Sequence, residues 1–516
     1  MIPPAEPPPF FAAARVPVLT SDEMRGWDER AIQRRGVPER VLMESAGRAA
    51  AAVVQRLFPG GRVVAAVGSG NNGGDAMVVL RTLRAWGRDV AAVQVGRTPP
   101  DAALLHGWEL PTISPDDAAD AFRGAGVIVD GLLGTGSSGP PRDAYAAAIA
   151  AIHAAVRPVV ALDGPSGIDL TTGAAPGEAV RADVTVTFGA PKRGLLLFPG
   201  RAHAGRIVAV EIGFPPLVDA EATARLVTPA WAHAMLPPVP ANAHKGVMGR
   251  VFVVAGRHGM AGACVLAGMG ALRAGAGMLY LCSAHENREI LQTRVPEALF
   301  VDRGALDTAT VASADAIVAG PGMGTDNAAL QDLRLLARSG DGPLLLDADA
   351  VTLLARNPSF RDDIARPLLL TPHPGEMARL LARTTGDVTA DPFAAAREAA
   401  ERFRCTVLLK GTPSLVAAPG RPTLVNATGH SGIATGGNGD VLSGIAGAFL
   451  ALGIDAQEAA AAALYFAGRA AEIAGRGRGL LPRDVIESLP VAMLEEPAGE
   501  NALGVAEVVL DLAVAR

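Results

Sequence analysis

The chain has 516 residues, more than one hydrophobic core normally serves, so its length predicts two domains of about 200–300 residues each. Apolar residues make up 49% of the sequence, and 60 glycines accompany them, which is typical of close-packed α/β proteins with many tight turns. A formal net charge of −6 argues against nucleic-acid binding, and charges interrupt every apolar run before it reaches membrane-spanning length. Three scattered cysteines indicate neither a disulfide framework nor a zinc site. We therefore expect a cytoplasmic protein without nucleic-acid or membrane partners.

The first part of the chain alternates between strand and helix patterns. Residues 1–19 are rich in proline and lack the basic and apolar blocks of a signal peptide, which predicts a disordered tail. Over 20–227, apolar runs alternate with alanine-rich helical runs, and we expect strands at 62–68, 90–95, 127–134, 158–164, 184–189 and 206–213. Strands that are apolar throughout and separated by helices predict a parallel sheet covered on both faces.

A second alternation follows a break. Residues 228–241 contain four prolines and no sustained period, so we predict a linker there. Over 242–516 we expect strands at 250–256, 277–283, 316–322, 343–349, 367–373 and 406–411, a hairpin at 414–426 and a long helix at 454–475. The fold class is therefore α/β, with two such domains in tandem.

The stretch GSGNNGGD begins at a predicted strand end and leads into a helix. Gly68, Gly70 and Gly73 fit the G-x-G-x-x-G pattern, in which a helix N-terminus faces an anion. The acidic residue that a dinucleotide site needs about 20 positions on is missing, because the next strand ends in Val95 and Arg97 follows shortly after it. A plain dinucleotide site is therefore disfavoured.

Polar residues instead follow several strands of the first half. Asn72, Asp130 and Ser166 would meet at the carboxyl edge of a parallel sheet, where they could act as hard oxygen donors for an alkali or alkaline-earth cation. Asp163 would remain free for acid–base chemistry, and Lys192 lies just past another strand. Each aspartate or asparagine taken alone also fits a helix cap or a turn.

Four segments in this order, GSGNNGGD, VDGLLGTG, DGPSGID and TFGAPKRG, resemble the Rossmann-like NAD(P)H-hydrate epimerase domain over most of 20–220. The resemblance implies that Asn72, Asp130 and Ser166 hold potassium and that Asp163 contacts the substrate. We expect Asp163 to transfer a proton with help from Lys192. The resemblance also implies substrate binding by Asn71, Asn72, Gly73, Gly74, Asp75, Gly134, Thr135, Gly136, Ser137, Ser138, Gly139 and Pro140.

The second half contains no P-loop and no protein-kinase signature. TGGNGD at 435–440 precedes an apolar helix, and the N–H groups of its glycines with the helix start predict an anion-binding concavity. Asp440 would be either the helix cap or a base aimed at a substrate hydroxyl. Polar residues also lie at the ends of predicted strands at Asp347, His373 and Lys410, although His373 could equally make a structural hydrogen bond.

The blocks HKGVMGRVFVVAG, GPGMG, LDADA, LTPHPGEM, LLKGTPS and GNGDVLSGI resemble the ribokinase-like ADP/ATP-dependent NAD(P)H-hydrate dehydratases over about 242–490. Asn438 stands where that family usually has threonine. The resemblance implies that the hydrated nicotinamide lies near Ala263, Gly322, Gly324, His373 and the catalytic Asp440. It implies adenine-nucleotide binding by Lys410, Gly411, Thr412, Pro413, Ser414 and Gly439.

Together the two resemblances predict a bifunctional repair enzyme. Its substrates would be the hydrates of NADH and NADPH (NADHX and NADPHX), with ADP as the phosphoryl donor and K⁺ and Mg²⁺ as cofactors. We also expect a homo-oligomer. Two alternatives stay open: a vitamin-precursor kinase of the ribokinase-like fold, acting on a thiazole or pyrimidine alcohol, or a dehydratase whose first domain only binds.

Overall fold

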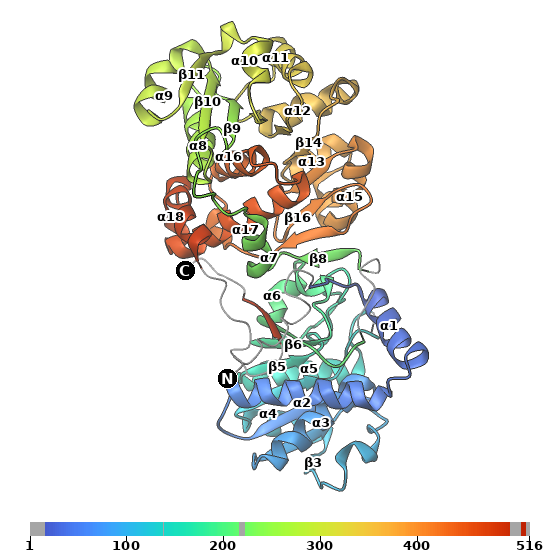
Figure 1. Ribbon diagram of the computed structural model, residues 1–516. Helices are drawn as coiled ribbons and strands as arrows, with labels where there is room; N and C mark the ends of the chain where they lie inside the picture. The colour runs from blue at the N-terminus through green and yellow to red at the C-terminus, as the bar shows by residue number, and fades with distance from the viewer. Residues whose placement is uncertain (1–15, 138, 216–221, 496–506, 512–516) are drawn as a thin grey trace. The chain divides into compact units, whose positions relative to one another are not determined.

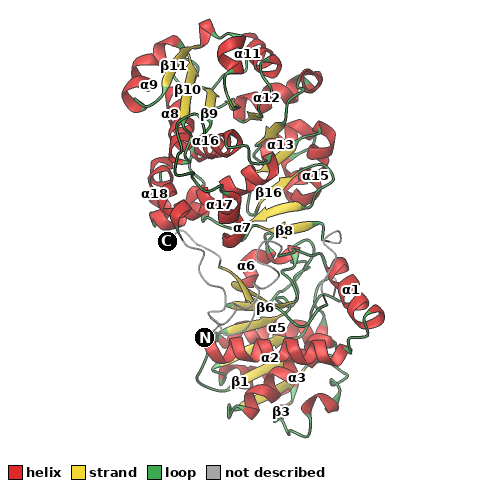
Figure 2. Ribbon diagram, viewed as in Figure 1, coloured by secondary structure: helices red, strands yellow, loops and turns green. Residues whose placement is uncertain are grey.

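The computed structural model describes residues 16–137, 139–215, 222–495 and 507–511, and the chain divides into two α/β units (Figure 1). The first unit comprises Met1–Ala224 and Ala498–Leu512, and the second comprises Arg225–Pro497 and Ala513–Arg516. Each unit has one sheet accompanied by helices (Figure 2), which confirms the predicted fold class. Most of the predicted tail, residues 1–15, and the predicted site residue Ser138 lie outside the described residues.

The sheet of the first unit has the strand order β18-β7-β6-β5-β4-β1-β2-β3. Paired strands run parallel, except that β18 is antiparallel to β7. The strands are β1 (Val63–Val67), β2 (Val90–Gln94), β3 (Thr112–Ile113), β4 (Val127–Gly131), β5 (Val159–Leu162), β6 (Val184–Phe188), β7 (Arg206–Val210) and β18 (Glu507–Leu510).

Helices cover both faces of this sheet. The helices are α1 (Ser21–Glu29), α2 (Glu39–Leu57), α3 (Asn71–Ala85), α4 (Ala118–Arg123), α5 (Asp143–Ala155) and α6 (Gly200–Ala204). Along β1, Val63 and Ala65 pack in one core with α2 and α3, whereas Val64 and Ala66 pack in another core with α4 and α5. Alternate side chains of a strand point to opposite faces, so a strand covered on both sides reads as continuously apolar.

The second sheet has the order β11-β10-β9-β12-β13-β14-β15-β16-β17-β8. The predicted hairpin is confirmed, since β16 pairs antiparallel with both β15 and β17. The strands are β8 (Ala224–Leu226), β9 (Arg250–Val254), β10 (Met278–Ser283), β11 (Leu299–Asp302), β12 (Ala316–Ala319), β13 (Leu344–Leu346), β14 (Leu368–Leu370), β15 (Thr406–Leu409), β16 (Ser414–Ala417) and β17 (Thr423–Asn426).

The core of the second unit joins this sheet to its central helices. Val251 and Val253 of β9 pack in one cluster with buried residues of α8, α16 and α17. No helix in the described part of the chain has the length and apolarity needed to cross a membrane. The helices are α7 (Pro229–Met235), α8 (Ala261–Arg273), α9 (Arg288–Arg294), α10 (Thr308–Ala312), α11 (Asn327–Arg338), α12 (Ala348–Arg356), α13 (Pro374–Leu381), α14 (Thr385–Ala390), α15 (Pro392–Phe403), α16 (Asn438–Ala451), α17 (Ala456–Ala474) and α18 (Pro482–Leu494).

The unit boundaries differ from the predicted ones at two places. Part of the expected linker 228–241 is the helix α7, which Thr228 caps through the N–H of Trp231 at 3.2 Å, and Trp231 is buried in the second core. The end of the expected second domain instead supplies β18 to the first sheet. Edge pairing depends on residues far apart in the chain, so sequence patterning did not reveal it.

Candidate active sites

A cavity of about 480 Å³ opens in the first unit where β1, β4 and β5 end and α3 begins. The cavity gathers predicted residues from separate strand ends. Those that line it are Asn71, Asn72, Asp75, Gly134, Thr135, Gly136, Ser137, Asp163 and Lys192. Four described residues of the predicted substrate-binding set do not line it, namely Gly73, Gly74, Gly139 and Pro140, and neither do the predicted metal ligands Asp130 and Ser166. Gly73 has a packing role, because a Cβ there would lie 2.1 Å from the Gly68 carbonyl oxygen.

Asp163 and Lys192 form a buried ion pair in this cavity. Lys192 Nζ donates to Asp163 Oδ1 at 2.5 Å and to the Phe188 carbonyl oxygen at 2.7 Å, and only 1% of the lysine side chain is exposed. The other carboxylate oxygen, Oδ2, accepts the Thr135 N–H at 3.2 Å. Asp163 has a φ of 64°, in the left-handed region that residues other than glycine rarely adopt. Its neighbours thus hold it as a fixed, charged acceptor facing the cavity.

The three predicted metal ligands lie together around the Leu133 peptide. Asn72 Nδ2 donates to the Leu133 carbonyl oxygen at 2.9 Å, and the Leu133 N–H donates to Ser166 Oγ at 2.9 Å. Ser166 Oγ in turn donates to Asp130 Oδ1 at 2.7 Å. Burial raises the pKa of Asp130 to about 6, although hydrogen bonds from Ser166 oppose the rise. The amide oxygen of Asn72 is buried and has no partner in the described part of the protein.

The unsatisfied amide oxygen of Asn72 bears on whether Asn72, Asp130 and Ser166 could bind a cation. A buried oxygen without a donor is destabilising unless water or an ion approaches it. Amide, carboxylate and hydroxyl oxygens are the donors that hard cations such as K⁺ prefer. The chemistry of Asn72, Asp130 and Ser166 therefore fits a hard cation.

Two acidic residues of the cavity were missed by strand-end reasoning. Asp28, on α1, and Glu39, at the start of α2, both line it, and Glu39 Oε1 accepts from Asn71 Nδ2 at 2.9 Å. Burial and the nearby Asp163 raise the pKa of Asp28 to about 6, against the opposing charge of Lys192. Burial, with Asp163 adding to it, holds the pKa of Asp75 well above its usual range. The T-x-x-E pattern at 20–23 predicts the start of α1, but nothing in the pattern predicts that Asp28 faces a cavity.

In the second unit, the glycine-rich loop leads into α16. Gly437 is the residue before the helix and has a φ of 99°, so it occupies the capping position that Asp440 was one candidate for. Asp440 lies in the first turn of α16. Burial, then the charges of Asp347 and Asp349, raise the pKa of Asp440 to about 7, although Lys410 opposes them. A carboxyl poised near neutral pH suits a general base.

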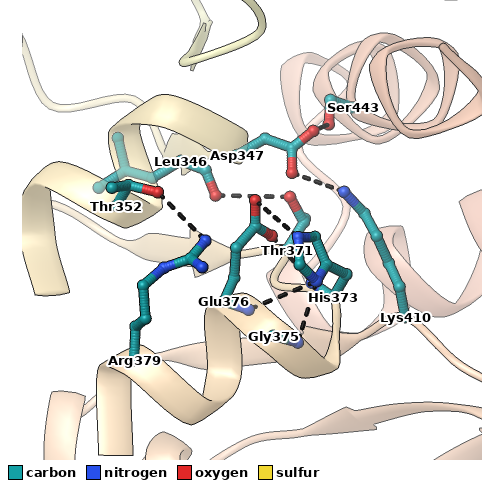
Figure 3. Close-up of polar contacts among 10 residues, drawn as sticks. All are labelled: Leu346, Asp347, Thr352, Thr371, His373, Gly375, Glu376, Arg379, Lys410 and Ser443. Carbon is teal, nitrogen blue, oxygen red and sulfur yellow. Dashed lines mark hydrogen bonds and ion pairs between the residues drawn. The ribbon is translucent and has the colours of Figure 1, made fainter. Parts of the chain in front are cut away.

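A salt-bridged network lies beside this helix entrance (Figure 3). Lys410 Nζ donates to Asp347 Oδ1 at 2.6 Å, and Ser443 Oγ of α16 donates to Asp347 Oδ2 at 2.7 Å. A Cβ built on Gly439 would lie 3.2 Å from Lys410 Nζ, which places the loop backbone against the lysine. Asp347 is 1% exposed, so it is a buried anchor that fixes the Lys410 ammonium at the loop.

His373 both caps a helix and remains available to a ligand. Its Nδ1 accepts the N–H of Gly375 at 3.0 Å at the start of α13, and its own N–H donates to Glu376 Oε2 at 2.9 Å. Burial and the positive charges of Lys410 and Arg379 lower the pKa of His373. About half of the side chain is exposed, and its Nε2 lies 3.4 Å from Glu376 Oε1.

The remaining predicted residues of this unit lie in two further groups. Gly322, with a φ of 56°, packs against Ala263, since a Cβ there would lie 3.2 Å from the Ala263 Cβ. The Gly324 N–H donates to Asp349 Oδ2 at 2.8 Å. Residues Gly411, Thr412, Pro413 and Ser414 form the turn between β15 and β16, which the Ser414 Oγ closes by donating to the Gly411 carbonyl oxygen at 2.9 Å.

Asn438, the departure from the family pattern, does orient the loop. Its Nδ2 donates to the Ile433 carbonyl oxygen at 2.9 Å, whereas its Oδ1 is buried with no partner among the described residues. A threonine has no amide with which to make this particular contact.

Models of two protein families match the chain, one in each unit. A model described as NAD(P)H-hydrate dehydratase matches residues 251–490, and one described as YjeF-related protein N-terminus matches residues 39–194. The matched ranges include Asp163 and Lys192 of the first site and Asp347, Lys410 and Asp440 of the second.

Relatives resemble the chain over almost its full length. The bifunctional NAD(P)H-hydrate repair enzyme Nnr of Moorella thermoacetica is 35% identical over 93% of this chain and 97% of its own length. The enzyme of the same name from Escherichia coli is 35% identical over 94% of this chain and 95% of its own. Among solved structures, the ADP/ATP-dependent NAD(P)H-hydrate dehydratase of Bacillus subtilis, co-crystallised with ATP and Mg²⁺, is 29% identical over 51% of this chain and 96% of its own, with a TM-score of 0.46.

Proposed function

The chain belongs to the bifunctional NAD(P)H-hydrate repair enzymes, and on that premise we propose that each α/β unit carries one of the two reactions. The protein is an enzyme that epimerises R- and S-NAD(P)H hydrate and dehydrates the S epimer. One observation supports the assignment of one reaction to each unit: each unit has a carboxylate next to another charged group. Asp163 of the first unit is paired with Lys192, and Asp440 of the second lies near the charge of Asp347. Both NADHX and NADPHX are proposed substrates.

For epimerisation, Asp163 is the proposed base. Lys192 holds it ionised at the cavity wall, and the cavity of about 480 Å³ has room for the nicotinamide ring. The N–H groups around Gly134 and Thr135 and the start of α3 would face the nucleotide phosphates. Asn72, Asp130 and Ser166 would hold K⁺, which supplies positive charge beside an anionic substrate.

For dehydration, Asp440 is the proposed base. Hydroxide is a poor leaving group, so the hydroxyl on C6 of the hydrated nicotinamide ring is phosphorylated first. Asp440 takes the hydroxyl proton, and the hydroxyl oxygen attacks the terminal phosphorus of ADP, from which AMP leaves. Inorganic phosphate then departs from C6 as C5 loses a proton, which restores the ring double bond. The Gly439 N–H and the Lys410 ammonium would stabilise the transferring phosphoryl oxygens.

Mg²⁺ is proposed to bind with the nucleotide. No group of three or more His, Cys, Asp or Glu side chains in the described ranges is arranged to hold a metal. Protein-bound Mg²⁺ commonly takes most of its ligands from phosphates and water, with one or two carboxylates. Asp349, whose charge acts on the proposed base Asp440, fits such a role, and the ion would neutralise phosphate charge there.

The two alternatives are less well supported. A vitamin-precursor kinase would need neither the first cavity nor its ion pair, whereas the relatives named as repair enzymes match both units. A first unit that only binds would not need a buried lysine opposite a carboxylate at the cavity wall.

One assay tests the whole proposal. Purified protein is mixed with R,S-hydrate, and the two epimers are followed separately with ADP or ATP present. Loss of both epimers with ADP is expected. Loss of the S epimer alone would make the first unit a binding module, and turnover of a thiazole alcohol with neither epimer consumed would establish the kinase instead.

Two further expectations belong with this proposal. An apolar pocket of about 610 Å³ in the second unit, lined in part by the exposed side chains of Val239, Val247 and Leu494, supports a homo-oligomer. Cys264, Cys282 and Cys405 are all free and buried, which supports a reducing, cytoplasmic setting. Light scattering of the purified enzyme would measure the oligomeric state.

A further inference from the structure

Asp28 is a carboxylate of the first cavity to which the reaction above gives no role. It is half-buried and lines the cavity together with Asp163 and Lys192. No hydrogen bond or ion pair reaches its carboxylate from any residue that the structure describes, although Asp163 next to it has several. A half-buried carboxyl without a donor or a cation favours its protonated form.

The helix that carries Asp28 is firmly placed. Thr20 and Glu23 close a capping box at its start, with the Glu23 N–H donating to Thr20 Oγ1 at 3.1 Å. Trp27 is 3% exposed and contacts Phe214 edge-on, with ring centroids 5.9 Å apart. A π-helical turn, Arg30–Arg34, follows directly, and such turns are rare and often found at functional sites. Asp28 therefore occupies a fixed position between a buried anchor and an irregular turn.

The two carboxylates have opposite surroundings. Asp163 receives an ammonium group and a backbone N–H, both of which favour its ionised form. Asp28 receives neither, and burial, with the Asp163 charge adding to it, raises its pKa to about 6 although Lys192 opposes the rise. Two carboxyl groups whose environments separate their protonation states are the usual arrangement of an acid and a base in one site.

We propose that Asp28 is the catalytic acid that works with Asp163 in exchanging the epimers, an inference that rests on the proposed epimerase function. Asp163 takes the C6 hydroxyl proton, a C6=O double bond forms, the C6–N1 bond breaks, and N1 keeps the electron pair and receives the proton of Asp28. The carbonyl turns about the C5–C6 bond, and N1 attacks its other face. The N1 proton returns to Asp28 and the Asp163 proton returns to oxygen, so only the configuration at C6 has changed.

The other charged groups around Asp28 are less suited to this role. Glu39, on α2, is engaged by the Asn71 amide, and Arg25, on α1, is paired with Asp22. Asp75, on α3, is 8% exposed, and burial holds its pKa well above its usual range. Burial favours the protonated form of Asp75, which makes it less suited to an acid that must give up its proton and regain it in each cycle.

The test uses the full chain with Asp28→Asn, Asp28→Glu and, as the matched control, Glu29→Gln, an exposed carboxylate one residue further along the helix. The rate of R-to-S exchange is measured between about pH 5 and 9, with dehydration of pure S-hydrate in the same samples as a measure of intact protein. Asp28→Asn should lower kcat for exchange by on the order of 10²-fold or more. The wild-type kcat/KM should fall as the pH rises above about 6; this fall should disappear in Asp28→Asn and persist in Asp28→Glu, while Glu29→Gln behaves as wild type.

Three results would overturn the assignment. The first is exchange of the epimers by Asp28→Asn at the wild-type rate. The second is a lower exchange rate in Asp28→Asn with an unchanged pH profile. The third is that the fall in kcat/KM with rising pH disappears in Asp75→Asn and not in Asp28→Asn. The second result would indicate a purely structural role. Failure of the wild type to exchange the epimers would refute the epimerase function itself, and this inference with it, so the two failures are distinguishable.

Discussion

At the scale of single residues, the neighbours of a carboxylate decide what it can do. Asp163 follows the strand β5 and Asp440 lies in the first turn of α16; one is paired with an ammonium group, whereas the other lies near two further carboxylates. The first is held by its ion pair, whereas burial and the neighbouring charges raise the pKa of the second to about 7. Each position therefore allows a separate test of one reaction.

Substitution of Asp440, the proposed base of the second unit, should affect one activity only. Asp440→Asn cannot accept the C6 hydroxyl proton, so dehydration of S-hydrate with ADP should fall by on the order of 10²-fold or more while R-to-S exchange continues. Glu487→Gln, an exposed carboxylate of the same unit, is the control and should dehydrate normally. Product formation by HPLC measures both, and normal dehydration by Asp440→Asn would exclude it as the base.

The same residue predicts the pH dependence of dehydration. Burial raises the pKa of Asp440 to about 7, and a base must be ionised to accept a proton. kcat/KM for dehydration should therefore rise with pH and level off above about 7, falling about tenfold per unit below it. A rate that is flat from about pH 5 to 8 would show that no such group titrates in the free enzyme.

At the scale of elements, parallel strands collect residues from distant parts of the chain at one edge. The apolar runs predicted β1, β4, β5 and β15 closely, and because strand ends meet, they also predicted that Asn72, Asp130 and Ser166 would lie together. Asp28 was not predicted as a site residue because it lies on a helix, and the local sequence pattern does not indicate which side chains of that helix face the cavity. β18 was not predicted, because so short an edge strand forms only by pairing with β7, which is distant in sequence.

The entrance to α16 should depend on one glycine for its conformation. Gly437 has a φ of 99°, and a Cβ there would lie 2.6 Å from Leu266 Cδ1. Gly437→Ala should lower the free energy of unfolding of the second unit by about 1–2 kcal/mol from backbone strain, with the contact adding to it. Gly436→Ala is the matched control, since nothing lies within 4 Å of its Cβ position. Thermal unfolding compares the two, and equal midpoints would contradict the expected strain.

At the scale of the whole molecule, the first unit is built from two stretches of the chain that are separated by the second unit. The chain completes the second unit and then supplies β18 to the sheet of the first. β18 covers the edge of β7, in which Ile207, Val208, Ala209 and Val210 are fully buried. An uncovered strand edge exposes unpaired backbone groups and favours aggregation. The stability of the first unit therefore depends on a segment that lies beyond the second in sequence.

Truncation after Pro497 tests this dependence. Without β18 the first unit should lose backbone pairing along β7, so epimer exchange should decline at a lower temperature and the protein should aggregate more readily. Dehydration should be retained, because residues 225–497 keep the second core. Asp511→Asn is the control: it breaks only the exposed Arg206–Asp511 ion pair and should change stability by less than about 1 kcal/mol. Equal thermal inactivation of exchange in the truncated and full-length proteins would mean that β18 adds nothing to the first sheet.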